Sequence, residues 1–276
     1  MSGLIFLVLS FVFLILGFLG EGGHAASLIS WTSFVIVFGG TIGSLGTSFT
    51  MKQIKNIGRV LSVAFTGKST DLVELIFYLD HVLGKVRKEG FLSLEGELQE
   101  DESMNPFMKK GLQSAVDGVN PDDIRNMLEI ELEMSSKRHK VGAAMFDSAG
   151  GTAPTMGIVG TVLGLVHVLG GLAKADMNAL GGSISAAFLA TLYGLSSANL
   201  IFLPIATRLK NLAKQEQLEK EIIIEAISLI QENVSPTILR DTLKGFLDKK
   251  DQTKLESRYF GDLNKEESNK EETKIA

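Results

Sequence analysis

Two threonines are the residues of this chain whose type and surroundings could do chemistry. Thr161 lies in the apolar stretch 152–173, and Thr191 lies in the apolar stretch 183–207. A threonine in an apolar helix usually bonds to a carbonyl of its own helix, and that structural interpretation stays open. In the alternative, copies of one or both hydroxyls line a wet path for an ion.

Each stretch also contains a proline. Pro154 cannot donate to the carbonyl of Gly150, and Pro204 cannot donate to the carbonyl of Leu200. Each proline therefore marks either a static kink or a hinge that moves when a nearby charge changes. The sequence favours neither interpretation.

Small residues recur every four positions from Ala149 to Thr161 and from Gly182 to Ala198. This spacing places each set on one helix face, and in lipid such faces are where helices pack closely. Helix packing is the expected role of Gly157, Gly160, Gly164, Ala186, Ala190 and Gly194.

The elements that must position these residues are apolar helices. Spanning a membrane takes about 20 mostly apolar residues. Four segments qualify, namely Leu4–Gly20, Leu28–Phe49, Ala153–Leu172 and Ile184–Ala206. The first basic residue is Lys52, so the first segment lacks the basic start of a signal peptide and is expected to be a retained helix.

The four segments contain no Asp, Glu, Lys or Arg. Ion pathways in membranes normally contain an ionisable group. If this protein conducts ions, the carboxylate must come from a partner helix. His167 lies near the outer end of its span, where we favour a structural or interfacial role.

Lys and Arg residues crowd residues 50–140 and are nearly absent from the short turns at the other side. The positive-inside rule therefore places the long loop and both termini in the cytoplasm. The expected fold is an all-α membrane protein, with four transmembrane helices in two hairpins and a large helical cytoplasmic domain between helices 2 and 3. The expected parts are spans one and two in residues 1–50, a cytoplasmic helical domain in 51–148, spans three and four in 149–207, a cytoplasmic helical extension in 208–247, and a charged, disordered tail in 248–276.

Two helix starts stand out in the cytoplasmic part. Asp71 can cap a helix that ends at Gly90. Asn120 precedes Pro121 and two acidic residues, which is a strong helix start. No helix breaker follows until Gly150, so this second helix is expected to continue into the third span.

Charges of both signs surround a short apolar run at residues 91–94: Arg87, Lys88, Glu95 and Glu97. A solvated surface is one interpretation. A docking face is the other, because opposed charges steer a partner and fix its register.

Composition limits the remaining function classes. The chain has 276 residues, no cysteine and a net charge of −5, which argues against a nucleic-acid partner. No metal cluster, nucleophile triad or phosphate loop is visible in the sequence. We therefore expect no enzymatic activity, no metal and no cofactor.

Three motifs resemble the MotA family of flagellar motor stator subunits, which includes the sodium-driven PomA type. They are residues 87–95 (RKEGFLSLE), residues 153–161 (APTMGIVGT), and residues 190–194 (ATLYG) followed by Pro204. The resemblance covers roughly residues 1–245.

The resemblance implies a bacterial inner-membrane protein that forms a ring, a pentamer in this family, around two single-span MotB-type subunits. The partner's aspartate would take up the ion, H⁺ or Na⁺, and the ring would push on the rotor protein FliG. Thr161 resembles the sodium type, and the choice of ion stays open. The implied roles are rotor contacts for Arg87, Lys88, Glu95 and Glu97, conformational prolines for Pro154 and Pro204, and positions near the partner's aspartate for Thr161 and Thr191.

Three other functions compete with this one. A TolQ or ExbB type subunit, which energises the outer membrane, has one span before its cytoplasmic domain, whereas two are expected here. A passive membrane scaffold does not explain the threonines, the prolines or the charge cluster. A solute carrier would show polar midplane groups or repeats.

Overall fold

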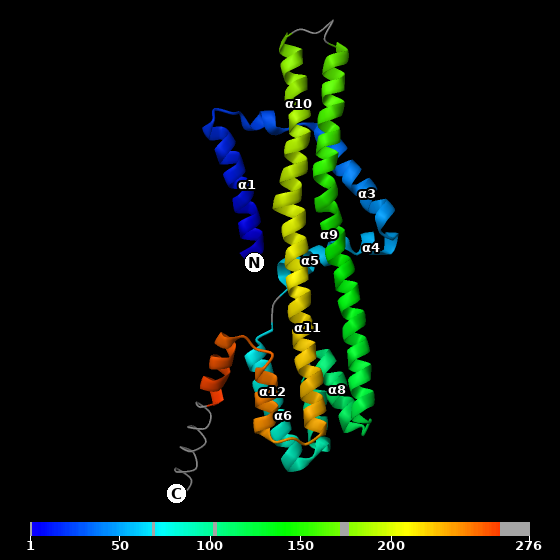
Figure 1. Cartoon of the computed structure of the whole chain (residues 1–276), viewed down its shortest axis with the longest axis vertical. Helices are drawn as coiled ribbons and strands as arrows, with labels where there is room; N and C mark the ends of the chain where they lie inside the picture. Colours follow the sequence, from blue (N-terminus) through cyan, green and yellow to red (C-terminus); the bar gives the residue numbers. More distant parts are fainter. Residues whose placement is uncertain (1, 68–69, 102–103, 172–176, 260–276) are drawn as a thin grey trace. The chain divides into compact units, whose positions relative to one another are not determined.

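The computed structural model of the chain describes residues 2–67, 70–101, 104–171 and 177–259, and these residues contain helices but no strand (Figure 1). The chain divides into two compact units. The first unit comprises Met1–Lys68 and Lys137–Ala213, and the second comprises Ser69–Ser136 and Lys214–Ala276. Helices α9 (Pro121–Gly171) and α11 (Leu203–Gln231) contribute residues to both units.

The rest of the first unit consists of α-helices, one 3₁₀ helix (η1) and two π-helices (η2 and η4). In chain order they are α1 (Ser2–Gly20), η1 (Ala25–Leu28), α2 (Trp31–Phe34), η2 (Val35–Gly39), α3 (Gly40–Ser48), α4 (Met51–Lys55), α5 (Ile57–Thr66), α10 (Met177–Ser196) and η4 (Ser197–Phe202).

Three helical stretches among the described residues are long and apolar enough to cross a membrane: Ala25–Ser48, Pro121–Gly171 and Leu180–Gln231. The helix Ile5–Gly20 is apolar but shorter. Its large apolar side chains, including Phe6 and Phe13, are mostly exposed, which suits an apolar surrounding better than water. The expected all-helical membrane class is therefore confirmed, while the count of four spans stays a prediction.

The basic segment that follows α3 is divided into two helices. Asn56 separates α4 from α5, and its backbone has φ −82° and ψ −3°. Helix α5 carries most of its apolar residues on one side, and Ala64 is fully buried. This interruption separates a basic turn from an amphipathic helix.

The second unit contains short helices around the buried part of α11. They are α6 (Leu72–Glu89), the 3₁₀ helix η3 (Phe91–Leu94), α7 (Glu95–Glu100), α8 (Pro106–Val116) and α12 (Pro236–Lys244).

One hydrophobic core holds the second unit together. Ile76, Leu79 and Leu83 of α6 are completely buried in it, and so are Ile223 and Ile230 of α11. Burying each such side chain contributes about 1.5–3 kcal/mol relative to exposure. The three α6 residues recur at intervals of three and four, which places them on one face of the helix.

The expected ends of α6 are also present. The Asp71 side chain accepts hydrogen bonds from the amides of Val73, at 3.0 Å, and Glu74, at 3.4 Å. Gly90 terminates the helix at φ 83°, a conformation that glycine adopts without steric cost.

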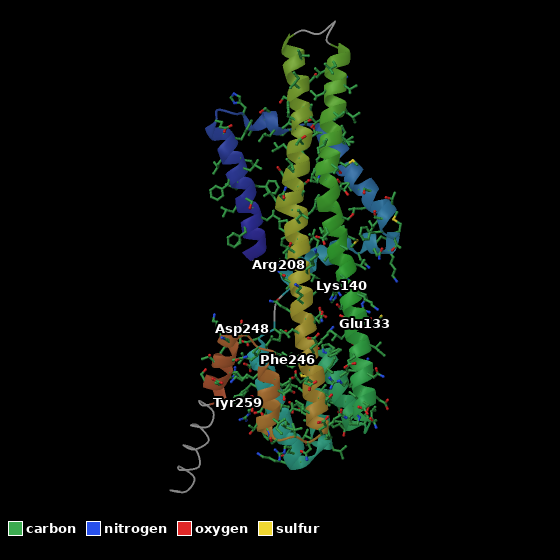
Figure 2. The ribbon with its side chains drawn as sticks, viewed as in Figure 1. Glu133, Lys140, Arg208, Phe246, Asp248 and Tyr259 are labelled. Carbon is green, nitrogen blue, oxygen red and sulfur yellow. The ribbon has the colours of Figure 1, made fainter. Side chains whose placement is uncertain are left out.

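Helix α9 is uninterrupted over 51 residues, as its strong start predicts. Asn120 accepts from the amide of Asp122 at 3.0 Å. Side-chain oxygen and nitrogen atoms crowd the part of α9 near Glu133 and Lys140 and become sparse along its apolar half (Figure 2).

The tail differs from the expectation of disorder from residue 248 onward. Residues 249–259 are helical, and Leu255 is 2% exposed in the core of the second unit. Lys254 Nζ lies 2.6 Å from Asp71 Oδ2, and Arg258 pairs with Glu74. Tyr259 ends this segment (Figure 2) and lies against Arg240, whose guanidinium carbon is 4.1 Å from the ring centroid. The segment has few apolar residues, so its composition did not indicate that Leu255 would be buried. Residues 260–276 lie outside the described residues.

Candidate functional site

Helices α9 and α10 approach closely because both have glycine at the contact. A Cβ atom on Gly157 would lie 2.8 Å from the carbonyl oxygen of Ala190. A Cβ atom on Gly194 would lie 2.6 Å from the carbonyl oxygen of Ala153. Neither position accepts a side chain without moving a backbone.

Two further glycines extend this contact. A Cβ atom on Gly160 would lie 2.6 Å from the Ala190 methyl, and one on Gly164 would lie 2.6 Å from the Ala187 methyl. The structure therefore brings together the small residues singled out by their spacing. Ala186 contributes through its backbone, because its carbonyl accepts a hydrogen bond from Ser33 Oγ at 2.8 Å.

The close approach brings the two threonines together. The hydroxyl oxygens of Thr161 and Thr191 are 2.5 Å apart. Thr161 Oγ1 also lies 3.1 Å from the carbonyl oxygen of Gly157 and 3.0 Å from that of Ala187. One hydroxyl has one proton, so Thr161 can donate to only one of these acceptors at a time. The pair can therefore switch donors with little movement.

A tyrosine that the sequence interpretation left without a role anchors η1 and α2 to α10. Tyr193 Oη donates to the carbonyl of Leu28 at 2.5 Å and accepts from the amide of Ser30 at 3.0 Å. In lipid an unpaired phenol is costly, so Tyr193 in an apolar helix was a signal that a partner exists.

The two prolines have different surroundings. Pro154 lies inside the continuous helix α9. Pro204 is the second residue of α11, and the π-helix η4 ends two residues before it. The ladder of i→i−4 hydrogen bonds is already shifted where Pro204 lacks a donor, so the distortion is shared by several residues. No sequence pattern predicts η4 or η2.

His167 lies on the wall of a cavity of about 420 Å³ between α2, α9 and α10. Three hydroxyl residues, Thr32, Ser33 and Ser183, line the same cavity. The cavity is thus next to the α9–α10 contact, and its polar atoms come from three helices.

The charged cluster of the second unit splits into two kinds of residue. Arg87, Lys88 and Glu95 are exposed, and they form no ion pair with any residue that the structure describes. Glu97 instead accepts a hydrogen bond from Tyr78 Oη at 2.8 Å and one from Lys85 Nζ at 3.0 Å. Glu97 is therefore already engaged within its own unit.

The surroundings of Glu97 shift two pKa values. Partial burial acts to raise the pKa of Glu97, but the hydrogen bonds from Tyr78 and Lys85 outweigh it and hold that pKa below its usual range. Burial, together with the bond to the Glu97 carboxylate, raises the pKa of Tyr78 well above its usual value. Glu97 therefore stays ionised and Tyr78 stays protonated at neutral pH.

These features define a helical membrane protein in which polar groups of different apolar helices are paired with one another. Two family descriptions match the chain. Residues 4–90 match the N-terminal region of motility protein A, and residues 99–222 match the MotA/TolQ/ExbB proton channel family. Together with the relatives below, these matches establish that the chain belongs to the motility protein A family.

The relatives cover most of the chain. It is 38% identical to motility protein A of Borreliella burgdorferi over 84% of this chain and 87% of that protein. It is 34% identical to the chemotaxis protein PomA of Vibrio alginolyticus over 90% of this chain and 95% of that protein.

Two solved structures are similar throughout. The MotAB stator complex of Bacillus subtilis matches with a TM-score of 0.84 and 34% identity over 92% of this chain and 99% of the matched chain. MotAB of C. jejuni matches with a TM-score of 0.83 and 33% identity over 90% of this chain and 96% of that chain.

Proposed function

We propose that this chain, a stator subunit of the flagellar motor, conducts ions together with a MotB-type partner and converts their flow into torque on the rotor protein FliG. The observation that carries the proposal is the Thr161–Thr191 pair, 2.5 Å apart, in spans that contain no Asp, Glu, Lys or Arg. A paired hydroxyl can solvate a passing ion but cannot hold a charge. The ionisable group must therefore belong to a partner.

The lack of ionisable groups in the spans also leads us to propose a ring of copies. One copy supplies one threonine pair, and a path through the membrane needs polar groups on more than one side. We propose a pentamer around two single-span partner subunits, with the partner's aspartate next to Thr161 and Thr191. The similarity to solved MotAB complexes supports a MotB partner.

The rotor contact is assigned to Arg87, Lys88 and Glu95, because these side chains are exposed and free of ion pairs among the described residues. Glu97 is better described as a support that holds α7 against α6 through Tyr78 and Lys85. A contact that steers a partner depends on exposed charge, which the first three residues provide.

The proposed topology has four spans, with both termini in the cytoplasm. The proposed first span, α1, is apolar but shorter than the three stretches that are long enough to cross a membrane. The transported ion is H⁺ or Na⁺, and no cofactor or enzymatic step is part of the proposal. Pro154 and Pro204 are proposed to bend or relax as the ion load changes.

The test is a strain that lacks this chain, with flagella counted by electron microscopy and swimming tracked. Paralysed cells with normal flagella are the expected result, and restoring the chain should restore motion. Replacing Na⁺ in the medium at constant pH then identifies the ion. Normal swimming in a strain without a second stator would contradict the proposal. An envelope or uptake defect with normal swimming would favour the TolQ/ExbB alternative.

A further inference from the structure

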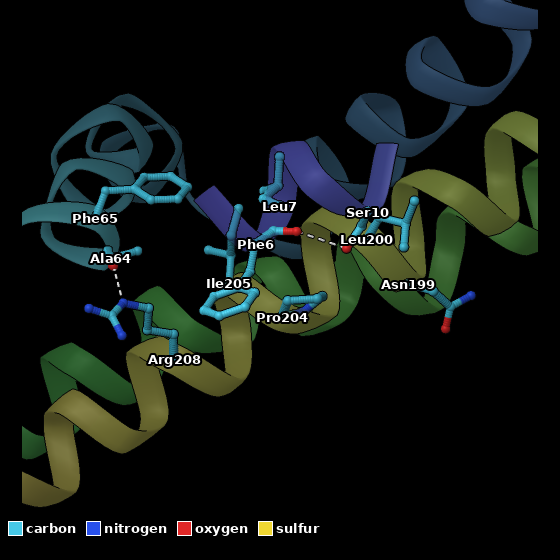
Figure 3. A pocket seen from close by; sticks show the side chains of 10 residues that line it. All are labelled: Phe6, Leu7, Ser10, Ala64, Phe65, Asn199, Leu200, Pro204, Ile205 and Arg208. Carbon is cyan, nitrogen blue, oxygen red and sulfur yellow. Dashed lines mark hydrogen bonds between the residues drawn. The ribbon is translucent and has the colours of Figure 1, made fainter. Parts of the chain in front are cut away.

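A second cavity lies away from the threonine pair, beside Pro204. It measures about 250 Å³ and is bordered by α1, α5 and the junction between η4 and α11 (Figure 3). Its walls are largely apolar, with Phe6, Phe65, Leu200 and Ile205 among them.

Among the described residues that line this cavity, Arg208 is the one with a cationic side chain. It is the first charged residue after the apolar fourth stretch, so it lies at the membrane surface. Its Nε donates to the carbonyl of Ala64 at 2.5 Å, which fixes the guanidinium at the cavity (Figure 3). No carboxylate among the described residues pairs with it, and a partly buried cation without a counter-charge is costly.

Neighbouring residues add positive charge without compensation. Helices α4 and α5 carry Lys52, Lys55 and Arg59, and residues 51–66 contain no acidic residue. All three cations lack a salt bridge to any residue that the structure describes. Helix α5, which borders the cavity, therefore belongs to a cationic segment, while the cavity walls are largely apolar.

We propose that this cavity binds one anionic phospholipid of the surrounding membrane. The phosphate accepts hydrogen bonds from the free terminal nitrogens of Arg208, whose planar fork suits a phosphate group. The first part of an acyl chain lies along Phe6, Leu200 and Ile205. Lys and Arg near a membrane surface each gain about 1 kcal/mol from anionic lipid, which favours an anionic over a neutral lipid beside Arg208.

The bound lipid would contact both α1 and the junction between η4 and α11. A lipid held between α1 and α11 would connect the N-terminal apolar helix to the helix that carries Pro204. The inference needs only that the chain spans a membrane, so it is independent of the stator function.

The experiment uses the full complex, purified with its partner and exchanged into a mixture of phosphatidylglycerol and phosphatidylcholine. Native mass spectrometry then counts the lipids that remain bound to each copy. The wild type should retain one phosphatidylglycerol per copy. Arg208→Ala should weaken this retention about tenfold, the loss expected for one charge-assisted contact.

Two further variants separate a site from general surface charge. Arg59→Ala removes an exposed cation that does not border the cavity, and it should leave the retained lipid unchanged. Ser10→Leu fills the cavity while keeping every charge, and it should lower retention as strongly as Arg208→Ala. The Ser10 hydroxyl bonds only to the carbonyl of Phe6 in its own helix, so its loss leaves α1 intact.

Three results would overturn the proposal. Equal retention of phosphatidylcholine would mean an apolar groove without headgroup recognition. Displacement by soluble glycerol phosphate would mean a free phosphate site. A carboxylate of a neighbouring copy against Arg208 in a structure of the purified complex would mean a contact between subunits.

Discussion

At the scale of single residues, the contact between α9 and α10 depends on glycines, which have no Cβ atom. The Cβ positions of Gly157 and Gly194 are occupied by backbone of the facing helix. Gly160 and Gly164 face the Cβ atoms of Ala190 and Ala187, which no side-chain rotation can move, so all four glycine positions exclude a side chain unless a helix shifts.

Gly194→Ala is therefore expected to destabilise the complex by about 1–3 kcal/mol, the usual cost of overpacking. Thermal unfolding of the purified complex measures it. Gly151→Ala in α9 is the matched control, because no atom lies within 4 Å of the added methyl. Equal stability of both variants would mean that α9 and α10 separate freely.

Thr191→Ala is expected to lower ion flux without preventing assembly, because Thr161 loses its hydroxyl partner. Flux through an unplugged complex in vesicles is the measurement. Thr191→Ser keeps the hydroxyl and should retain most of the flux. Unchanged flux in Thr191→Ala would reduce the residue to helix packing.

Glu97→Gln is expected to destabilise the second unit by about 1 kcal/mol at pH 7, since a charged bond to Lys85 is lost. The folded-state pKa of Glu97 lies below the unfolded value near 4.3, so its contribution is present above that value. It disappears as the pH falls through the folded-state pKa. Denaturant unfolding at pH 7 and at about pH 3 checks both signs, with the exposed Glu95→Gln as the control.

At the scale of elements, the helix 249–259 depends on one buried side chain. Leu255→Ala should cost about 2–5 kcal/mol locally, because the leucine is 2% exposed. Hydrogen exchange of residues 249–259 and of the first turn of α6 should accelerate in the full complex. Ile238→Ala, at a 52% exposed position of α12, should change neither. Unchanged exchange in Leu255→Ala would mean that this helix does not support α6.

The elements also show which parts of the fold the sequence predicts and which it does not. Caps are local chemistry, so Asp71 and Asn120 predict the starts of α6 and α9. Four-residue spacing predicts which glycines face a helix, but only the structure identifies the facing atom. The two π-helices, the break at Asn56 and the partners of Glu97 depend on distant contacts, and no local pattern encodes them.

At the scale of the whole molecule, the two units differ in the polar and charged groups that they leave without a partner. The hydroxyls of Thr161, Thr191 and Tyr193 in the apolar helices of the first unit are paired. The second unit keeps Arg87, Lys88 and Glu95 free of ion pairs with the described residues. Pairing suits an apolar surrounding, and unpaired exposed charge suits a changing partner.

Arg87→Glu is expected to reduce torque, and a reversed charge on the rotor should restore part of it. Swimming and bead rotation at low and high load measure the effect. Lys249→Glu reverses an exposed charge elsewhere in the same unit and should leave torque unchanged. Unaltered speed of the Arg87 variant at both loads would remove this residue from the rotor contact.

The π-helix η4 has a consequence for chain length. A π-turn accommodates one residue more than the α-helix around it. Deleting one residue within Ser197–Phe202 would let the ladder close as an α-helix, and each residue of an α-helix turns it by about 100°. Leu203 would leave Gly150, and Arg208 would leave the carbonyl of Ala64. The extra residue in η4 thus sets how the start of α11 is rotated about the helix axis relative to α10.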